Sequence, residues 1–277
     1  MIATRARRTG AGALALLLAA VGAPGVVFAA EACPAPIIRA LADASLLPAD
    51  GAPALVAQAC RVWPFDPALS LAAVAYPLPA SEAPVPRELR LVVAVLGTQD
   101  TRPLAVHTTD LAEDAVFALD ADGLRLDTAR YDLAPGVRAF GVVLRSAAPG
   151  ASCPDGRFND ELTLYVRNGS ALRPVFSSYL ELWQRIEGEP CSWTLDQRLV
   201  TEDAALSIGV EPGTHHGYAD LRVIANVSRT ERATGSSGDD AVTTQRRASR
   251  VVHYDGARYD VDALHNGFFW IRDPVDE

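Results

Sequence analysis

The stretch ELTLYVRNGSALRPVF, residues 161–176, decides the fold class predicted for this chain. Leu162, Leu164 and Val166 alternate with polar or amphipathic residues, and this period of two is typical of a β-strand with one buried face. The dipeptide Asn168-Gly169 follows directly and favours a tight turn between two strands. Apolar residues resume after the turn. The stretch therefore predicts an antiparallel β-hairpin.

The position of apolar residues on both sides of the turn predicts the length of its loop. A two-residue loop would place Leu164 opposite Arg173 and mix the two faces of the hairpin. A three-residue loop, residues 168–170, instead pairs Val166 with Leu172. The pattern therefore predicts the longer loop, with a bulge at its glycine.

Two further hairpins are predicted at Asp122-Gly123 and Asp255-Gly256, because Asp-Gly suits a type I′ turn. Two-residue loops at these positions give the cross-strand pairs Leu119 with Leu126, Val252 with Tyr259, and His253 with Arg258. Each pair combines residues of similar polarity, which supports both registers.

The remaining strands complete a mainly β prediction. Residues 89–96 are a nearly continuous run of Val and Leu, as expected of a strand buried on both faces. Further strands are predicted at residues 69–75, 137–145, 178–183, 192–199 and 221–227. Residues 229–249 are polar around GSSGDD and are predicted to form a mobile loop. Residues 65–277 thus predict an antiparallel β-sandwich or open barrel.

A helical segment, residues 30–64, is expected before the β domain. Apolar residues after Pro34 recur at helical spacing, and a second short helix is predicted from Pro53 to Cys60. A disulfide between Cys33 and Cys60 would hold these two helices together as an antiparallel pair.

The first 29 residues have the layout of a secretory signal peptide. Arg5, Arg7 and Arg8 precede an apolar run over residues 11–21, and small residues follow at the predicted cleavage position. The run is shorter than the roughly 20 residues that span a membrane, so no membrane span is expected after cleavage. Cleavage before Cys33, which would make a lipoprotein, is the alternative. The expected location is periplasmic or secreted.

All four cysteines follow the predicted signal, which suits two disulfides in an oxidising compartment. Four cysteines allow three connectivities. Pairing in sequence order is favoured because it keeps each bridge within one local segment: Cys33 with Cys60, and Cys153 with Cys191.

Composition excludes several classes of function. All 25 cationic side chains are Arg, so the chain has no lysine for a P-loop, a Schiff base or a kinase site. The net charge is −9, and loss of the three signal arginines lowers it further. Such a charge repels phosphate backbones, so no nucleic-acid partner is expected. No cofactor is predicted either.

The histidines offer one candidate for metal binding: His215, His216 and Asp220 lie close together in the sequence. Neighbouring residues of an extended chain point to opposite faces, so two adjacent histidines seldom bind one ion. We therefore predict a polar turn that leads into the strand at residues 221–227, and no metal site. His253 is predicted to be a solvated neighbour of Arg258.

Aromatic residues give the binding candidates. Tyr179 and Trp183 share one face of their predicted strand, and Phe269 and Trp270 lie near the C-terminus. Exposed Tyr and Trp suit recognition of a protein or a sugar, and packing against a second sheet would explain the same residues.

No catalytic residue is assigned from the sequence. The nucleophile motif G-x-S-x-G is absent, and both disulfides would leave no free thiol. Acidic residues such as Asp155, Asp160 and Glu161 cluster near Cys153. A glycosidase needs two acids in one cleft, and solvated surface residues explain this cluster equally.

Several stretches resemble a family of secreted or periplasmic proteobacterial proteins that have no assigned activity. They are residues 126–141 (LDTARYDLAPGVRAFG), 164–175 (LYVRNGSALRPV), and 215–221 (HHGYADL) with 254–259 (YDGARY). The resemblance implies an exported β-rich protein and carries no site residue to this chain.

These observations lead to two hypotheses of function. The first is a non-enzymatic exported protein that binds a protein or a glycan of the bacterial envelope. The alternative is a secreted hydrolase whose acidic site is assembled only by the fold. A cleft with convergent carboxylates would favour the hydrolase, and an exposed aromatic patch would favour the binding protein.

Overall fold

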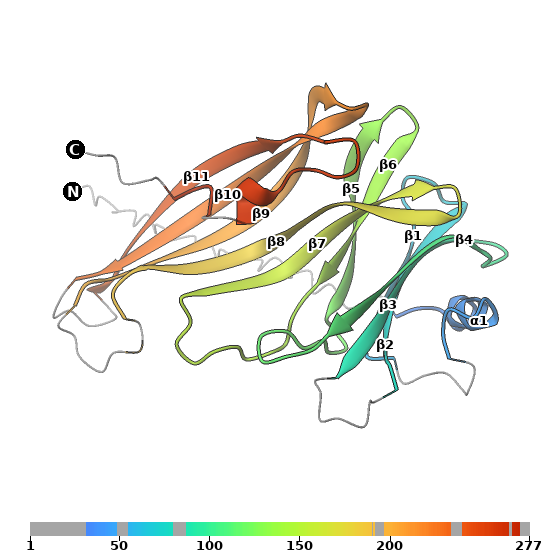
Figure 1. The fold of residues 1–277 in the computed structure, drawn as a ribbon, viewed down its shortest axis with the longest axis horizontal. Helices are drawn as coiled ribbons and strands as arrows, with labels where there is room; N and C mark the ends of the chain where they lie inside the picture. Colours follow the sequence, from blue (N-terminus) through green and yellow to red (C-terminus); the bar gives the residue numbers. More distant parts are fainter. Residues whose placement is uncertain are drawn as a thin grey trace, which may run out of the picture.

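The computed structural model describes residues 32–48, 55–79, 87–189, 191, 197–233, 240–265 and 268–271, and this part of the chain is mainly β (Figure 1). The predicted signal peptide, residues 1–29, lies outside it. The elements are α1 (Ala35–Asp43), β1 (Ala57–Val62), β2 (Leu69–Pro77), β3 (Glu88–Gly97), β4 (Pro103–Ala112), β5 (Leu124–Ala134), β6 (Val137–Leu144), β7 (Gly156–Asn168), β8 (Ala171–Glu187), β9 (Leu199–His215), β10 (Tyr218–Arg232), β11 (Val242–Val252) and α2 (Asp262–His265).

The N-terminal segment contains one of the two predicted helices. α1 begins after Pro34, as predicted, but residues 57–60 belong to β1 and not to a second helix. All six residues of β1 pair with β2, and Ala57 and Ala59 are buried. Pairing with a neighbouring strand has overridden the helical preference of alanine.

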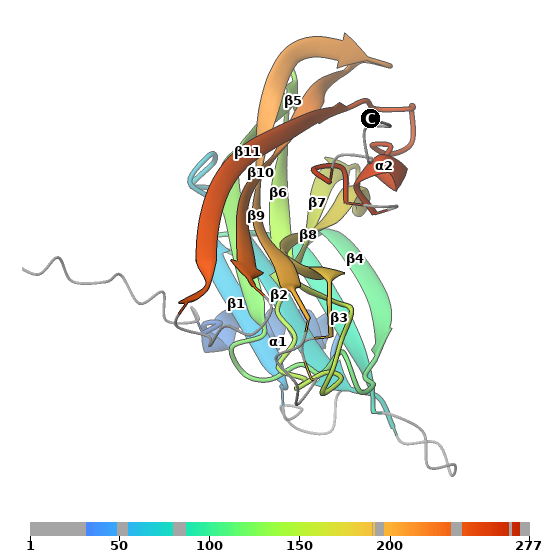
Figure 2. The same cartoon turned by 90° about the vertical axis from the view of Figure 1, so that its left-hand side faces the viewer.

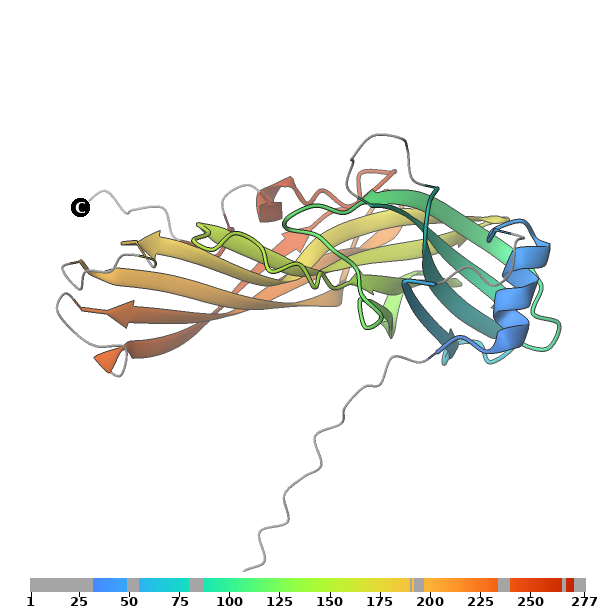
Figure 3. The same cartoon turned by 90° about the horizontal axis from the view of Figure 1, so that it is seen from below.

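The predicted disulfide between Cys33 and Cys60 is present and ties the start of α1 to β1. Ile37 and Leu41 of α1 are buried against the adjacent face of the sheet, where residues of β1, β2 and β3 meet them: Cys60, Ala72, Val74, Tyr76, Val92, Ala94 and Leu96. Figure 3 shows α1 in blue beside these strands. Within the described ranges, neither helix combines the length and apolar character that crossing a bilayer would require.

The strands form one open, mixed sheet rather than a closed barrel, and a sandwich is not confirmed. Its order is β1-β2-β3-β4-β8-β7-β6-β5, and β9, β10 and β11 continue from β8. All of these pairs are antiparallel except β4 with β8, which meet in parallel at Val106 and Ala171. At the two ends of the eight-strand path, Arg61 Nη1 of β1 donates to Thr128 Oγ1 of β5 over 3.4 Å.

Besides the cluster around α1, two larger cores lie on different parts of this sheet. The first eight strands enclose one core, which includes Trp63, Leu91, Leu126, Phe140 and Tyr165. The second core joins β5–β8 to the long strands β9–β11 and to the C-terminal segment: Leu133, Leu162, Leu182, Val223, Tyr259 and Leu264. Figure 2 shows β9–β11 curving along one side of the molecule, with β1–β4 below them. β8 contributes to both cores.

The hairpin predicted from residues 161–176 is present as β7 and β8, but its loop is shorter than predicted. Asn168 pairs with Ala171, so the loop is Gly169-Ser170 instead of residues 168–170. Gly169 has a φ of 63°, which a residue without a Cβ adopts at little cost.

The register after this loop also differs from the prediction. Val166 lies opposite Arg173 instead of the apolar residue predicted. The register shifts next to Pro174, and Leu164 then lies opposite Phe176. Proline lacks an N–H to donate, so it suits the interrupted position of the ladder. The bulge thus restores the pairing of apolar with apolar residues.

The turn at Asp122-Gly123 does not join two paired strands. Leu126 pairs with Val142 of β6, so the predicted pair of Leu126 with Leu119 is wrong. The Asp120 carboxylate instead accepts the N–H of Asp122 over 3.1 Å, which closes a local turn before β5. Competition from such side-chain hydrogen bonds is why Asp favours turns outside hairpins as well.

The third predicted turn, at Asp255-Gly256, is present with a longer loop. Tyr259 bridges Tyr254 and not Val252, so the turn spans four residues. The Asp255 carboxylate accepts two backbone N–H groups inside it, each over 2.7 Å. This capping favours the longer turn over a two-residue loop.

The mobile loop predicted at residues 229–249 is largely a β-ribbon. β10 and β11 pair continuously from Leu221 with Val252 to Glu231 with Val242, and residues 234–239 lie outside the description. Strand pairing needs backbone groups rather than apolar side chains, and β-branched residues support it: Thr230 Oγ1 and Thr243 Oγ1 lie 3.2 Å apart.

The other predicted strands agree with the structure. Residues 69–75, 89–96, 137–144, 178–183 and 221–227 all lie within strands, and 89–96 is buried on both faces except at one position. Of the strand predicted at residues 192–199, positions 192–196 lie outside the described residues.

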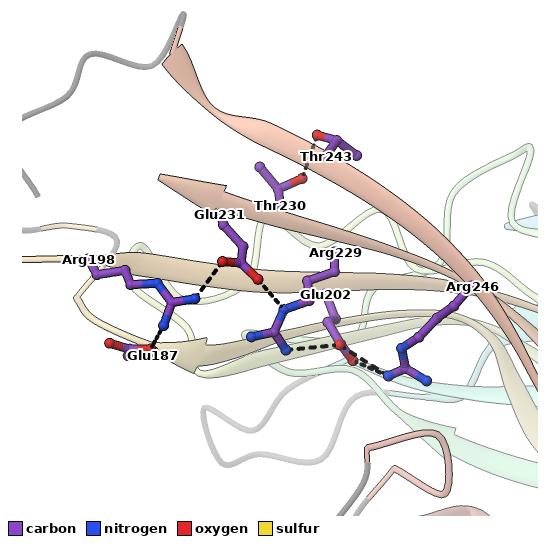
Figure 4. Close-up of polar contacts among 8 residues, drawn as sticks. All are labelled: Glu187, Arg198, Glu202, Arg229, Thr230, Glu231, Thr243 and Arg246. Atoms are coloured by element: carbon purple, nitrogen blue, oxygen red, sulfur yellow. Dashed lines mark hydrogen bonds and ion pairs between the residues drawn. The ribbon is translucent and has the colours of Figure 1, made fainter. Parts of the chain in front are cut away.

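Ion pairs link the exposed ends of β8–β11, and one carboxylate among them is buried (Figure 4). Glu202 of β9 is 2% exposed. It accepts from Arg246 Nη2 of β11 over 3.0 Å and from Arg229 Nη1 of β10 over 3.4 Å. Glu231 accepts from Arg229 and from Arg198, which extends the network. These contacts hold three adjacent strands in register.

We expect Glu202→Gln to lower the free energy of unfolding by about 2 kcal/mol, because a buried amide cannot replace the charge-assisted hydrogen bonds from Arg229 and Arg246, whereas both guanidiniums stay partly solvated. Urea unfolding of parent and variant measures this. The matched control is Asp110→Asn, which breaks the exposed Arg90–Asp110 pair and should cost less than about 1 kcal/mol. Equal losses in the two variants would contradict a structural role for the buried network.

Candidate functional site

A cavity of about 920 Å³ lies against β7, β8 and β9. The opposite wall comes from the end of β4, from residues 116–117, and from the loop that precedes β7. β4 pairs with β8 at a single position, so the two strands separate on the way to the cavity. The disulfide Cys153–Cys191 ties that loop to the segment after β8. The cavity is thus bounded by strands on one side and by anchored loops on the other.

Strand register determines which side chains face the cavity. Glu161 lies opposite Tyr179, and Trp183 lies opposite both Arg157 and Asp203. Side chains of directly opposed residues share a face, as do residues two apart on one strand. All five line the cavity. The sheet therefore presents aromatic and charged side chains on a single wall.

Two aromatic rings that line the cavity, Phe158 and Tyr179, contact each other. Phe158, which is 48% exposed, lies 5.3 Å from Tyr179 between ring centroids and stacks on Phe268 at 5.6 Å. The Arg157 guanidinium lies over the Trp183 ring, 5.7 Å from its centroid. The predicted binding candidates Tyr179 and Trp183 are therefore both half-buried in the cavity wall. Phe158 was not among the residues predicted from the sequence. Its ring contacts lie on β8 and in the C-terminal segment, and the alternation of residues along β7 does not reveal them.

The carboxylates of the wall differ in their partners. Glu181 accepts from Arg145 over 3.0 Å, and Glu161 accepts from the Ser177 hydroxyl over 2.8 Å. Burial raises the pKa of Asp203, and within the described residues no cation offsets this. Burial thus favours the protonated form of the Asp203 carboxyl.

The loop that carries the facing wall is held by Glu113. This carboxylate is 8% exposed and accepts two hydrogen bonds from Arg87, at 2.5 and 2.7 Å. It also accepts the N–H of Leu119 over 2.7 Å. The Arg87 guanidinium, together with the Leu119 N–H, lowers the pKa of Glu113 despite its burial. Because Val116 and Phe117 lie between these anchor points, Glu113 positions that part of the cavity.

The other two aromatic candidates are placed elsewhere. Trp270 is 2% exposed and packs in the second core, which agrees with the packing alternative and not with an exposed binding residue. Phe269 is half-buried beside it, with their ring centroids 5.3 Å apart, and Arg250 lies over Phe269. The packing alternative holds for Trp270 because the C-terminal segment folds back over the second core.

Of the metal candidates, His215 and Asp220 come together and a different histidine joins them. His215 Nδ1 lies 2.7 Å from Asp220 Oδ1, and His253 Nδ1 lies 3.1 Å from the same oxygen. His216 is not part of this group. His216 lies in the turn after β9 with a φ of 48°, and the second imidazole comes instead from the end of another strand.

His253 reaches this cluster because of two irregularities in the ribbon. A register shift between Ala219 and Leu221 interrupts the pairing of β10 with β9 at Asp220. The longer final turn removes His253 from its predicted place opposite Arg258, which lies in the turn itself. The cluster could have been predicted only from the pairing register of β9, β10 and β11. The spacing of the three residues in the sequence does not indicate it.

Asp220 is buried, with 5% exposure, and its position depends on a glycine. A Cβ at Gly213 would lie 2.7 Å from Asp220 Oδ2, so a larger residue there would make the carboxylate shift. Burial by itself would raise the pKa of Asp220, but hydrogen bonds from His253 and His215 outweigh burial and lower it.

We expect the stabilising effect of Glu113 to depend on pH. Its pKa is lowered in the folded state from an ordinary value of 4.5, so ionisation stabilises the fold above that value and the stabilisation is lost as pH falls through the folded pKa. Glu113→Gln should therefore be less stable than the parent at neutral pH, and the difference should shrink in acid. Urea unfolding across a pH series measures it. A difference that stays constant or widens on acidification would contradict this account.

Comparison with known proteins finds no family model, no curated protein and no solved structure that matches this chain.

Proposed function

We propose that this chain is an exported protein that binds a glycan of the bacterial envelope in the cavity against β7–β9. One observation carries the proposal: Trp183 and Tyr179 share a concave strand face with the carboxylates of Glu161, Glu181 and Asp203. A sugar ring has apolar C–H faces that pack on aromatic rings, and hydroxyl groups around its edge that donate to carboxylates.

The size and shape of the cavity favour a small ligand over a flat protein surface. Its volume of about 920 Å³ lies near the upper end of the roughly 300–1,000 Å³ common for ligand sites. The wall is supported by paired strands, so its aromatic rings are held in place before a ligand arrives. Such preorganisation lowers the entropy lost on binding.

The charge of the lining selects among glycans. The acidic residues Asp110, Glu161, Glu181 and Asp203 line the cavity, and Arg157 is the cation among the described lining residues. Glu181 pairs with Arg145, and Asp110 pairs with Arg90, so Glu161 and Asp203 supply the excess of negative charge over Arg157. This excess disfavours phosphorylated, sulfated or uronic-acid sugars. Neutral sugars and amino sugars fit the lining best.

Export is supported by the two disulfides, which persist in oxidising compartments. Together with the signal peptide expected at residues 1–29, they support a periplasmic or secreted location. An envelope glycan is the abundant ligand class that a protein in that compartment would meet.

A secreted hydrolase is the second candidate, and Asp203 is the observation that favours it. A general acid needs a raised pKa, and burial raises that of Asp203 in the cavity wall. A glycosidase also needs a second carboxylate at a suitable distance, and Glu161 and Glu181 are the candidates on the same face. Product analysis separates this reading from simple binding.

The test is titration of the oxidised protein with neutral glucan oligosaccharides and with N-acetylated amino-sugar oligomers, measured by calorimetry. We expect one of these classes to bind and Trp183→Ala to weaken its binding about tenfold or more, as buried aromatic anchors usually do. Trp183→Phe should keep most of the affinity because it keeps a ring. Sulfated oligosaccharides of the same length should bind more weakly.

The matched control is Phe65→Ala, which removes an aromatic ring with 47% exposure that does not line this cavity. It should bind like the parent. Absence of binding to every oligosaccharide, or equal affinity of parent and Trp183→Ala, would reject glycan binding in this cavity. Release of shorter products that stops in Asp203→Asn would assign the hydrolase instead.

A further inference from the structure

The cluster of His215, Asp220 and His253 has the composition of a transition-metal site. The possible ligand atoms of the three residues all lie within 4.8 Å of one another. Two imidazole nitrogens with one carboxylate oxygen suit Zn²⁺, Cu²⁺ and related ions, whereas Ca²⁺ and Mg²⁺ prefer oxygen ligands alone.

The distances fit an ion after small side-chain adjustments. His215 Nδ1 and His253 Nδ1 lie 2.7 and 3.1 Å from Asp220 Oδ1. Ligands bound tetrahedrally at about 2.0–2.2 Å are about 3.3–3.6 Å apart, so the His253 distance nearly fits and the His215 imidazole would move back by about 0.6 Å or more. The same nitrogens that now face the carboxylate would face the ion, so binding needs no rearrangement of the backbone.

The fold fixes the central ligand and leaves the others accessible. Asp220 is buried, and the absent Cβ of Gly213 makes room for it. The side chains of His215 and His253 are 49% and 55% exposed. Their rings lie 4.1 Å apart between centroids and approach Asp220 from the ends of two different strands. An ion held here keeps access to solvent, which leaves a position for water or another ligand.

We propose that His215, Asp220 and His253 bind one transition-metal dication such as Zn²⁺ or Cu²⁺. The site is separate from the glycan cavity, since none of its three residues lines that cavity. Three protein ligands with one open position are typical of sites where a metal acts on a bound molecule or joins a second surface.

Calorimetric titration of the oxidised chain, prepared without a polyhistidine tag, with Zn²⁺ and with Cu²⁺ tests the proposal. We expect one equivalent to bind. His215→Ala and His253→Ala should each weaken metal binding by at least about tenfold. Loss of a residue that only orients a metal ligand already costs about that much, and a ligand itself should cost more. Metal should also raise the thermal midpoint of the parent more than that of either variant.

His216→Ala is the matched control, because it removes a neighbouring imidazole outside the cluster. It should bind metal like the parent. Both tested histidines are exposed, so their variants should fold, and circular dichroism checks this. If the parent binds neither ion, His215, Asp220 and His253 form a hydrogen-bonded cluster and not a metal site. An equal loss in His216→Ala and His215→Ala would show adventitious binding by histidines, and either result would overturn the proposal.

Discussion

A strand has two edges for hydrogen bonding. The arrangement of the molecule depends on β8, which pairs with one strand along one edge and with two different strands along the other. One edge pairs with β7 along most of the strand. The other meets β4 at Ala171 and β9 from Glu181 onward. Between these partners, the Val175 carbonyl accepts the N–H of Tyr259, so the C-terminal segment completes the edge. Because one strand serves both halves, the sheet must split, and the space beside the split contains the cavity.

Local patterns predicted the elements well and their partners poorly. Alternation identified β7, and the apolar run at residues 89–96 identified a strand buried on both faces. Residues 57–60 have the composition of a helix and form a strand because β2 offers a complete set of partners. The polar residues 242–249 have the composition of a loop. They form a strand because β10 provides backbone hydrogen-bond partners, which their side chains do not reveal. Long-range pairing is the part that one sequence does not contain.

The candidate sites show the same division. Tyr179 and Trp183 were identified as a pair on one face, and that inference needed only the period of a strand. Their acidic neighbour Asp203 is 20 residues further along the chain than Trp183 and becomes its neighbour through the β8–β9 register. Equally, His253 meets Asp220 through a register shift and a four-residue turn. The dipeptide Asp255-Gly256 also suits a two-residue loop, so it does not predict the four-residue turn. No turn dipeptide marks the register shift at Asp220.

Both candidate sites lie where regular pairing is interrupted. β4 leaves β8 after one bridge, and the cavity opens between the diverging strands. The pairing of β10 with β9 shifts at Asp220, which turns a carboxylate toward two histidines. An uninterrupted ladder places side chains at fixed intervals on two faces, and the shift at Asp220 changes those intervals. Bulges and splayed strands allow such changes, while the ladders on each side keep the converging groups in place. Both proposed sites thus combine side chains placed by regular pairing with an adjacent irregularity of the sheet.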